Sequence, residues 1–303
     1  MSIYLRQRTI SRPATCSGIG VHSGREVSLT IKPAPVNHGI KFIRTDLPGR
    51  PEIAAHFNKV VDTSLATVIG YDGVIISTIE HIMATFSAFS IDNAHVEVND
   101  YELPIMDGSA APFVSMIRQA GVIEQEAPRY FFIVKKTIAL HQGDRSVVIY
   151  PSPIYKITCN IDFKHPLINQ QSLTIDVTEK TFENEIAGAR TFGFLHELEY
   201  LKKYGFARGG ALDNAIVIDK HNILNPDGLR FPDEFVRHKI LDCIGDFSLL
   251  GMPILGHVVA TRSGHFFNHE FLKQFFNQKG SWETSCLHKL SEPGSCATKH
   301  LAI

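Results

Sequence analysis

Three polar side chains recur every four residues along one predicted helix: His238, Asp242 and Asp246. Such positions form a line along a helix surface, and a histidine and an aspartate one turn apart can bind the same divalent cation. The simpler interpretation is a solvated face whose carboxylates pair with Lys239, because ion pairs on helix surfaces are common. On this segment alone, both interpretations stay open.

The helix that carries these residues has clear start and stop signals. Pro232 suits a first helical turn, and the acidic pair Asp233 and Glu234 favours the positive end of the helix. Gly251 and then Pro253 mark its end. Between these limits, apolar residues at helical spacing predict one buried stripe, formed by Phe235, Val236, Ile240, Cys243, Phe247 and Leu250.

A second His–acid pair, Glu80 and His81, lies at the start of another predicted helix. His81 points away from the apolar stripe of that helix, which consists of Ile79, Ile82, Met83 and Phe86. Ser77 and Glu80 match a capping box, which would give Glu80 a purely structural role. If His81 instead faces His238 and Asp242 across a cleft, three ligands and one open position result. That arrangement is typical of catalytic zinc.

Two further segments could contribute to a pocket. His265, in Ser263-Gly264-His265, follows a predicted buried strand and could donate a proton or simply begin a helix. Thr191, in Arg190-Thr191-Phe192-Gly193-Phe194, could present a hydroxyl beside aromatic rings. The residues alone do not decide between these roles.

The chain has 303 residues, 44% of them hydrophobic, with a formal net charge of −1. A near-neutral chain lacks the basic surface typical of nucleic-acid binding, so we expect no nucleic-acid partner and no stable membrane insertion. Five cysteines without paired spacing indicate a reducing compartment. The first ten residues lack the apolar core of a signal peptide. We therefore expect a cytoplasmic protein, acting as a monomer.

Strands and helices follow one another in the same order twice, which predicts an α+β fold. We expect two similar domains, residues 1–127 and 128–303. If the two halves face each other, a cleft between them would hold the His81, His238 and Asp242 site. The expected strands and hairpins cover 26–33, 39–44, 65–76, 94–99, 130–150, 156–163, 214–219 and 254–260. The other expected helices cover 112–120, 178–188, 195–204 and 266–278, followed by a loosely ordered tail from Ser281.

Eight segments, in this order, resemble the UDP-3-O-acyl-N-acetylglucosamine deacetylases, zinc enzymes of lipid A biosynthesis in Gram-negative bacteria. They run from the first strands to the last helix: GIGVHSG (18–24), ISTIEHIMA (76–84), SIDNAHVEVN (90–99), PIMDGSAAPF (104–113), IDFKHP (161–166), ARTFGF (189–194), LRFPDEFVRHKILDCIGD (229–246) and SGH (263–265).

The resemblance implies one Zn²⁺ per chain and hydrolysis of the acetamide of UDP-3-O-(3-hydroxyacyl)-N-acetylglucosamine. It makes Glu80 the general base and His265, beside Asp246, the general acid or charge stabiliser, with Thr191 at the developing oxyanion. The metal ligands that it implies are His81, His238 and Asp242. It also implies that each domain is a sheet packed on helices and that the active site lies in the cleft between them.

The same resemblance implies where the substrate binds. Lys239, Phe163 and Phe192 would contact its sugar and nucleotide. Arg145 stands where the family has a lysine near the diphosphate, and a guanidinium contacts phosphate differently from an ammonium group. Two family insertions fall near 40–73 and 194–221. The second would form an apolar passage for the acyl chain, lined by Leu198 and Leu201.

Two other functions compete with this one. A metal-dependent phosphohydrolase would use similar ligands, but that class usually needs two adjacent metals and the helix offers few spare carboxylates. A nucleotide-sugar binding protein with a structural metal is the non-enzymatic alternative. An open coordination position beside a glutamate argues against it.

Overall fold

The computed structural model describes residues 3–287. The first part of the chain contains, in order, β1 (Arg6–Ile10), β2 (Ala14–Ile19), β3 (Glu26–Pro33), β4 (Ile40–Arg44), β5 (Glu52–Ala54), the 3-10 helix η1 (Phe57–Lys59), β6 (Val60–Asp62), β7 (Val68–Tyr71), β8 (Val74–Ile76), α1 (Glu80–Ala88), β9 (Ala94–Val98) and α2 (Ala111–Ala120).

The second part continues through more strands and the longer helices. It contains β10 (Val122–Pro128), β11 (Tyr130–Val134), β12 (Ile138–Gln142), β13 (Arg145–Tyr150), β14 (Tyr155–Phe163), β15 (Asn169–Asp176), α3 (Glu179–Thr181), the π-helix η2 (Phe182–Ile186), β16 (Phe192–Phe194), α4 (Leu195–Lys203), β17 (Ile216–Ile218), α5 (Glu234–Ser248), β18 (Ile254–Thr261), α6 (His265–Asn277) and β19 (Trp282–Cys286).

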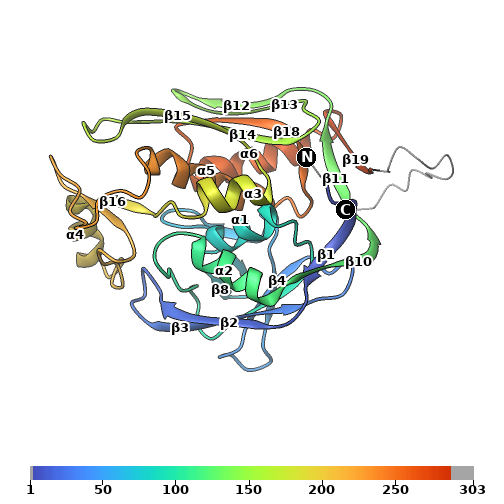
Figure 1. Cartoon of the computed structure of the whole chain (residues 1–303), viewed down its shortest axis with the longest axis horizontal. Coiled ribbons are helices and arrows are strands. Elements are labelled where there is room, and N and C mark those ends of the chain that lie inside the picture. Colours follow the sequence, from blue (N-terminus) through green and yellow to red (C-terminus); the bar gives the residue numbers. More distant parts are fainter. Residues whose placement is uncertain (1–2, 288–303) are drawn as a thin grey trace.

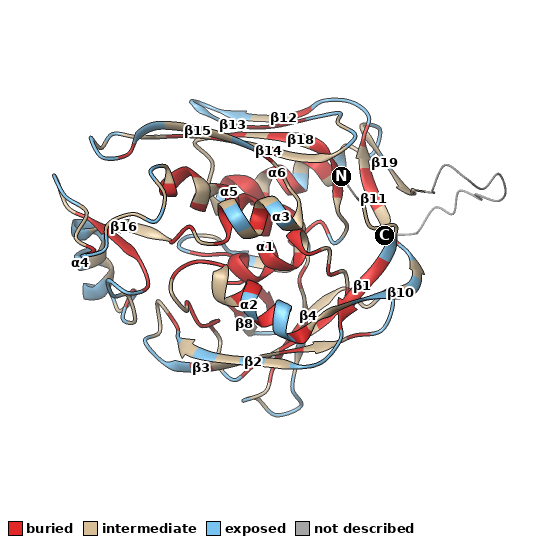
Figure 2. Ribbon diagram, viewed as in Figure 1, coloured by how far each residue is buried: buried red, intermediate tan, exposed pale blue. Residues whose placement is uncertain are grey.

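Two sheets form the outer layers, and the longer helices lie between them (Figure 1). One sheet has the order β2-β3-β9-β4-β5; the other has the order β12-β13-β18-β11-β19, with β14 paired to β18 and β15 paired to β14. Smaller sheets are β1-β10, β6-β7-β8 and β16-β17. Figure 2 shows buried residues in the helices between the layers and in strands such as β1, β11 and β18. The predicted α+β class is confirmed.

Buried and more exposed side chains alternate along the strands, so that one face of a sheet packs against the core. In β3, the buried positions are Val27, Leu29 and Ile31, and the residues between them are more exposed.

The predicted hairpin at 65–76 forms β7 and β8, joined at Asp72 (φ 50°) and Gly73 (φ 77°). Two successive residues with positive φ are what a two-residue hairpin turn of the common type requires.

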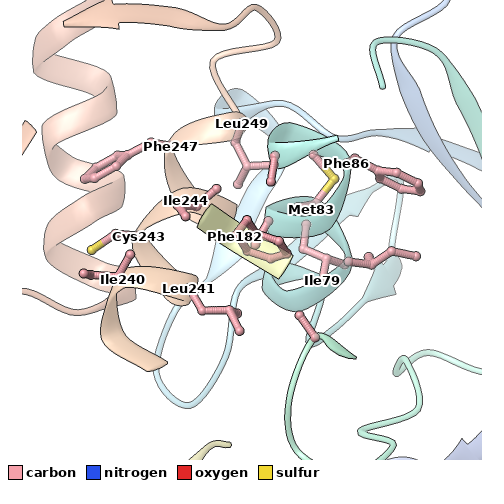
Figure 3. Close-up of a cluster of buried hydrophobic side chains, with 14 of the residues drawn as sticks. Ile79, Met83, Phe86, Phe182, Ile240, Leu241, Cys243, Ile244, Phe247 and Leu249 are labelled. Atoms are coloured by element: carbon pink, nitrogen blue, oxygen red, sulfur yellow. The ribbon is translucent and has the colours of Figure 1, made fainter. Parts of the chain in front are cut away.

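Helix α5 is buried on nearly all sides because α1 and α6 pack against it. Figure 3 shows Ile244 and Leu249 pointing toward Met83 of α1, with Phe182 between the two helices. On the other side of α5, the ring of Phe247 lies 6.0 Å from that of Phe271 on α6. The single apolar stripe predicted for this helix therefore underestimates its burial.

Gly245 allows α5 to cross α1 at very short distance. A Cβ at this position would overlap the backbone carbonyl oxygen of Glu80 and would lie 2.8 Å from its carbonyl carbon. Only a residue without a side chain permits such a backbone approach. The crossing brings the start of α1, with Glu80 and His81, against the polar line of α5.

Several expectations need correction. Helix α1 begins one residue after its N-cap Ile79, and no side chain caps it, so the capping box of Ser77 and Glu80 does not form. The hairpin expected over 130–150 consists of β12 and β13 only, while β11 pairs with β18 and β19. Strands β1, β2, β5, β6, β10, β15 and β16 were not foreseen. Residues 282–286 of the expected loose tail form β19, and residues 288–303 lie outside the described part of the chain.

The expected domain boundary near 121–129 coincides with β10, which pairs antiparallel with β1. The division into residues 1–127 and 128–303 stays a prediction. Within residues 3–287, no helix is long and apolar enough to cross a membrane.

Candidate active site

Three residues that were predicted as metal ligands converge in one buried cluster. Donor atoms of His81, His238 and Asp242 all lie within 4.8 Å of one another. The Nε2 atoms of His81 and His238 are 3.8 and 3.5 Å from Asp242 Oδ1. All three side chains are buried, which excludes the solvated-face interpretation of α5. The cluster joins α1 to α5, so it depends on the close crossing at Gly245.

The protonation of these ligands suits a cation. Burial, and then the neighbouring His238, lowers the pKa of His81 to about 3, and burial also lowers the pKa of His238, so both rings are neutral. His238 Nδ1 donates to the carbonyl oxygen of Ala189 at 3.0 Å, which leaves the Nε2 lone pair directed at the cluster. Burial alone would raise the pKa of Asp242, but Lys239 and His238 hold it well below its usual range.

This donor set fits a divalent metal. Two neutral imidazoles and one carboxylate are a ligand set found in catalytic zinc sites, with one position left for water or substrate. Nearby, Lys239 Nζ donates to the other carboxylate oxygen of Asp242 at 2.8 Å, which orients that ligand from outside. The described residues therefore offer a metal site in which His238 is oriented by Ala189 and Asp242 by Lys239.

Glu80 lies beside this cluster and is 4% exposed, too little for water to solvate its carboxylate freely. Burial raises its pKa to about 7, although the charge of His265 opposes the shift. Its Oε2 accepts a hydrogen bond from the amide of Thr67 at 3.1 Å. The carboxylate is therefore free of any capping role and is poised to exchange a proton near neutral pH.

His265 and Asp246 form a buried ion pair at the start of α6. Nδ1 of His265 lies 2.9 Å from Asp246 Oδ2. Burial alone would lower the pKa of His265, but the Asp246 carboxylate raises it to about 10. Asn268 Nδ2 also donates to Asp246 Oδ2 at 2.8 Å. The imidazole is thus held in its charged form next to Glu80, whose own pKa is close to neutral.

The segment that carries Thr191 is fixed by a buried ion pair at the start of α5. Glu234 is fully buried and accepts hydrogen bonds from the amide and guanidinium of Arg190 and from the amide of Arg230. The amide of Thr191 donates to the carbonyl oxygen of Gly108 at 2.8 Å. Among the described residues, the Thr191 hydroxyl has no protein partner, so it is available to a ligand.

A cleft of ≈ 450 Å³ brings together several predicted substrate residues, among them Lys239, Phe163 and Arg145. Phe192 borders the same region, because its ring lies 5.5 Å from that of Phe163 and 5.6 Å from Lys239 Nζ. Lys239 thus joins the cleft to the metal cluster through Asp242.

Some of the cationic side chains that line this cleft form ion pairs with carboxylates, and others do not. Arg262 is paired with Asp144 and with Asp162, at 2.9 Å for the second pair. Among the described residues that line the cleft, Arg145 and Lys164 are the cations without an ion-pair partner. They are therefore the groups available to an anionic ligand.

Leu198 and Leu201 lie apart from the metal cluster, on α4. No residue of this helix is buried, and it projects at the edge of the molecule in Figure 1. A Cβ on Gly193 would be in van der Waals contact with Leu198, at 3.4 Å, so α4 packs back on β16. The acyl passage proposed from the sequence stays a prediction.

The analysis of the sequence missed Thr67, Asn268 and the Arg190–Glu234 pair. Glu234 was noted only as a residue of a first helical turn. Thr67 lies in a loop, 179 residues before its partner Asp246, and no spacing rule connects the two.

Comparison with known proteins gives consistent matches. Residues 7–277 match the family model described as UDP-3-O-acyl N-acetylglycosamine deacetylase. A UDP-3-O-acyl-N-acetylglucosamine deacetylase of Myxococcus xanthus (strain DK1622) is 51% identical over 277 residues, covering 91% of this chain and 88% of that protein. Proteins of the same name from Syntrophotalea carbinolica and Coxiella burnetii (strain RSA 331) are 50% and 45% identical, over 91% and 92% of this chain and 90% and 93% of theirs.

Proposed function

This chain belongs to the UDP-3-O-acyl N-acetylglycosamine deacetylase family, and from that membership we propose that it removes the acetyl group from UDP-3-O-acyl-N-acetylglucosamine, giving acetate and the free amine in the committed step of lipid A biosynthesis. One observation carries the proposal: a cluster of three metal-ligand side chains, the buried carboxylate of Glu80 and the ion pair of His265 with Asp246 lie in one site. Metal-dependent amide hydrolysis uses a metal, a general base and a proton donor together.

The ligands proposed for the metal are His81, His238 and Asp242, and we assign zinc to them. A bound zinc polarises the amide carbonyl and lowers the pKa of water to about 7. The protein supplies the remaining chemistry through residues that are already oriented by neighbours.

The two ionisable groups of the site divide the proton transfers. Glu80, with a pKa of about 7, takes a proton from the attacking water. His265, with a pKa of about 10, stays protonated at neutral pH and donates to the departing amine nitrogen. The hydroxyl of Thr191 donates a hydrogen bond to the oxyanion that develops on the carbonyl. Asp246 holds His265 in its charged form throughout.

The cleft beside Lys239 is the proposed site of the sugar and nucleotide. The free cations Arg145 and Lys164 suit a diphosphate, and the rings of Phe163 and Phe192 suit a sugar or base face. Leu198 and Leu201 on α4 are proposed to contact the acyl chain. We further propose that the enzyme acts as a cytoplasmic monomer. Cys16, Cys159 and Cys243 form no disulfide, which supports the reducing compartment but not the oligomeric state.

Zinc content and deacetylation of the UDP-sugar, measured on the same samples, test this function. Glu80→Gln should retain one zinc per chain and lose turnover by about a hundredfold or more, because the base is removed while the ligands stay. Glu26→Gln, at an exposed strand position, is the matched control and should turn over normally. Undiminished turnover by Glu80→Gln would show that the base is elsewhere, and absence of deacetylation by the zinc-loaded protein would refute the function.

A further inference from the structure

Thr67 bonds to the three helices that carry the reacting groups. Its amide donates to Glu80 Oε2 at 3.1 Å, and its carbonyl oxygen accepts from the amide of Ile79 at 3.4 Å, so its backbone is tied to α1. Its hydroxyl donates to Asp246 Oδ1 on α5 at 2.6 Å and lies 3.3 Å from Nδ1 of His265 on α6. The residue is 2% exposed, so water does not replace these contacts.

The hydroxyl of Thr67 completes the set of donors around Asp246. The carboxylate also accepts from Nδ1 of His265 at 2.9 Å and from Asn268 Nδ2 at 2.8 Å. Thr67 bonds to Oδ1 and Asn268 to Oδ2, while Nδ1 of His265 lies 3.1 Å from Oδ1 and 2.9 Å from Oδ2. Rotation of the carboxylate would break at least one of these bonds, so its plane is fixed. Because Nδ1 of His265 is held by Asp246, only Nε2 is left for proton transfer, and its direction follows that plane.

We propose that Thr67 is a positioning residue for the deacetylation, which sets the general base and the acid pair in one geometry. The proposal rests on the proposed function and adds a residue to it. Glu80 and His265 come from different helices, α1 and α6, and Thr67 contacts Glu80 through its amide and His265 through its hydroxyl, both directly and by way of Asp246. Among the described residues, no hydrogen bond joins Thr67 to a metal ligand, and Thr67 does not line the cleft, so its effect should pass through Glu80 and His265.

The residue type explains why the position needs a threonine. A β-branched side chain has few allowed χ1 rotamers, so its hydroxyl is aimed before the bond forms. Serine keeps the hydroxyl but rotates more freely, and valine keeps the shape but has no donor. Activity should therefore decrease in the order Thr67, Thr67→Ser, Thr67→Val.

Steady-state kinetics, zinc content and urea unfolding of these two variants test the proposal. Thr67→Val should lower kcat by about tenfold to a hundredfold through misorientation of the acid, with KM and zinc content little changed. Thr67→Ser should recover most of the loss. Thr9→Val is the matched control, because Thr9 is 3% exposed and its hydroxyl donates to the carbonyl oxygen of Asn93 at 2.7 Å, remote from the site. It should lose stability and keep kcat.

A double-mutant cycle with His265→Ala, measured in single turnovers, separates positioning from general structural damage. If Thr67 acts through the acid, Thr67→Val should cost little further activity once His265 is gone. An equal loss in both backgrounds, or an equal loss of kcat in Thr9→Val, would overturn the proposal. The native protein and His265→Ala alone report on the proposed function, so a wrong function would be recognised before the cycle is read.

Discussion

Replacement of Gly245 by alanine tests how closely α1 and α5 must approach for the site to work. An alanine methyl would overlap the carbonyl oxygen of Glu80 and would lie 2.8 Å from the carbonyl carbon, where ordinary contact begins at 3.4 Å. The two helices must therefore separate, by roughly 1 Å, or one must shift along the other. Either movement displaces His81 and Glu80 from Asp242.

Two opposing effects set the expected change in stability. Alanine in a helix interior is favoured over glycine by about 1 kcal/mol. Overpacking of a core costs about 1–3 kcal/mol. The free energy of unfolding should therefore fall by only about 0–2 kcal/mol, the difference between these terms. Activity should fall much further, by about a hundredfold, because a displacement near 1 Å misplaces the reacting groups.

The assays are urea unfolding, zinc content and deacetylation of the UDP-sugar, measured on one preparation. Gly280→Ala is the control, since nothing lies within 4 Å of its Cβ position. A Gly245→Ala enzyme that is more stable, with normal zinc content and normal turnover, would refute the reasoning, because α1 would then accommodate the methyl without moving the site.

Three further predictions follow from the site. Removal of zinc by a chelator should abolish turnover while the far-UV circular dichroism stays native, because three ligands with one open position are typical of a catalytic metal; unfolding on chelation would contradict this. Asp246 raises the pKa of His265 from 6.5 to about 10, so the pair stabilises the fold fully below pH 6.5 and loses this contribution as the pH rises through about 10. Urea unfolding from pH 7 to 10 should show this decline in the native protein, and Asp246→Asn should flatten it; parallel curves would argue against the ion pair. Leu201→Asp should reduce turnover of acylated substrate and spare zinc binding, because each buried methylene of the acyl chain contributes about 0.8 kcal/mol. Equal turnover of substrates with and without the acyl chain would show that α4 does not bind it.

Local patterns predicted most elements well. Strand β3 was expected at 26–33 and is found there, because alternation depends only on neighbouring residues. Helix α5 and its polar line were likewise evident from periodicity and end signals. Strand β19, in contrast, was expected as loose tail, because its five residues are ordered by pairing with the distant β11.

The interpretation of Glu80 shows the limit of local reasoning. Ser77 and Glu80 have the spacing of a capping box, but α1 begins after Ile79 and the Glu80 carboxylate accepts from the Thr67 amide instead. A local pattern identifies a favourable option, and tertiary contacts decide whether it is used. Here the carboxylate turned into the site, where burial raises its pKa to about 7.

The sequence by itself identified the candidate ligands and ionisable groups, because side-chain chemistry and helical spacing are properties of short segments, and the resemblance to a known family supplied the roles of base and acid. Only the tertiary structure decided that His81 faces His238 and Asp242, that their helix is buried, and that Thr67 and Glu234 hold the surrounding groups. The physical reason is the crossing at Gly245. A contact between backbones far apart in the chain leaves no periodic signal, yet it sets the distances on which the chemistry depends.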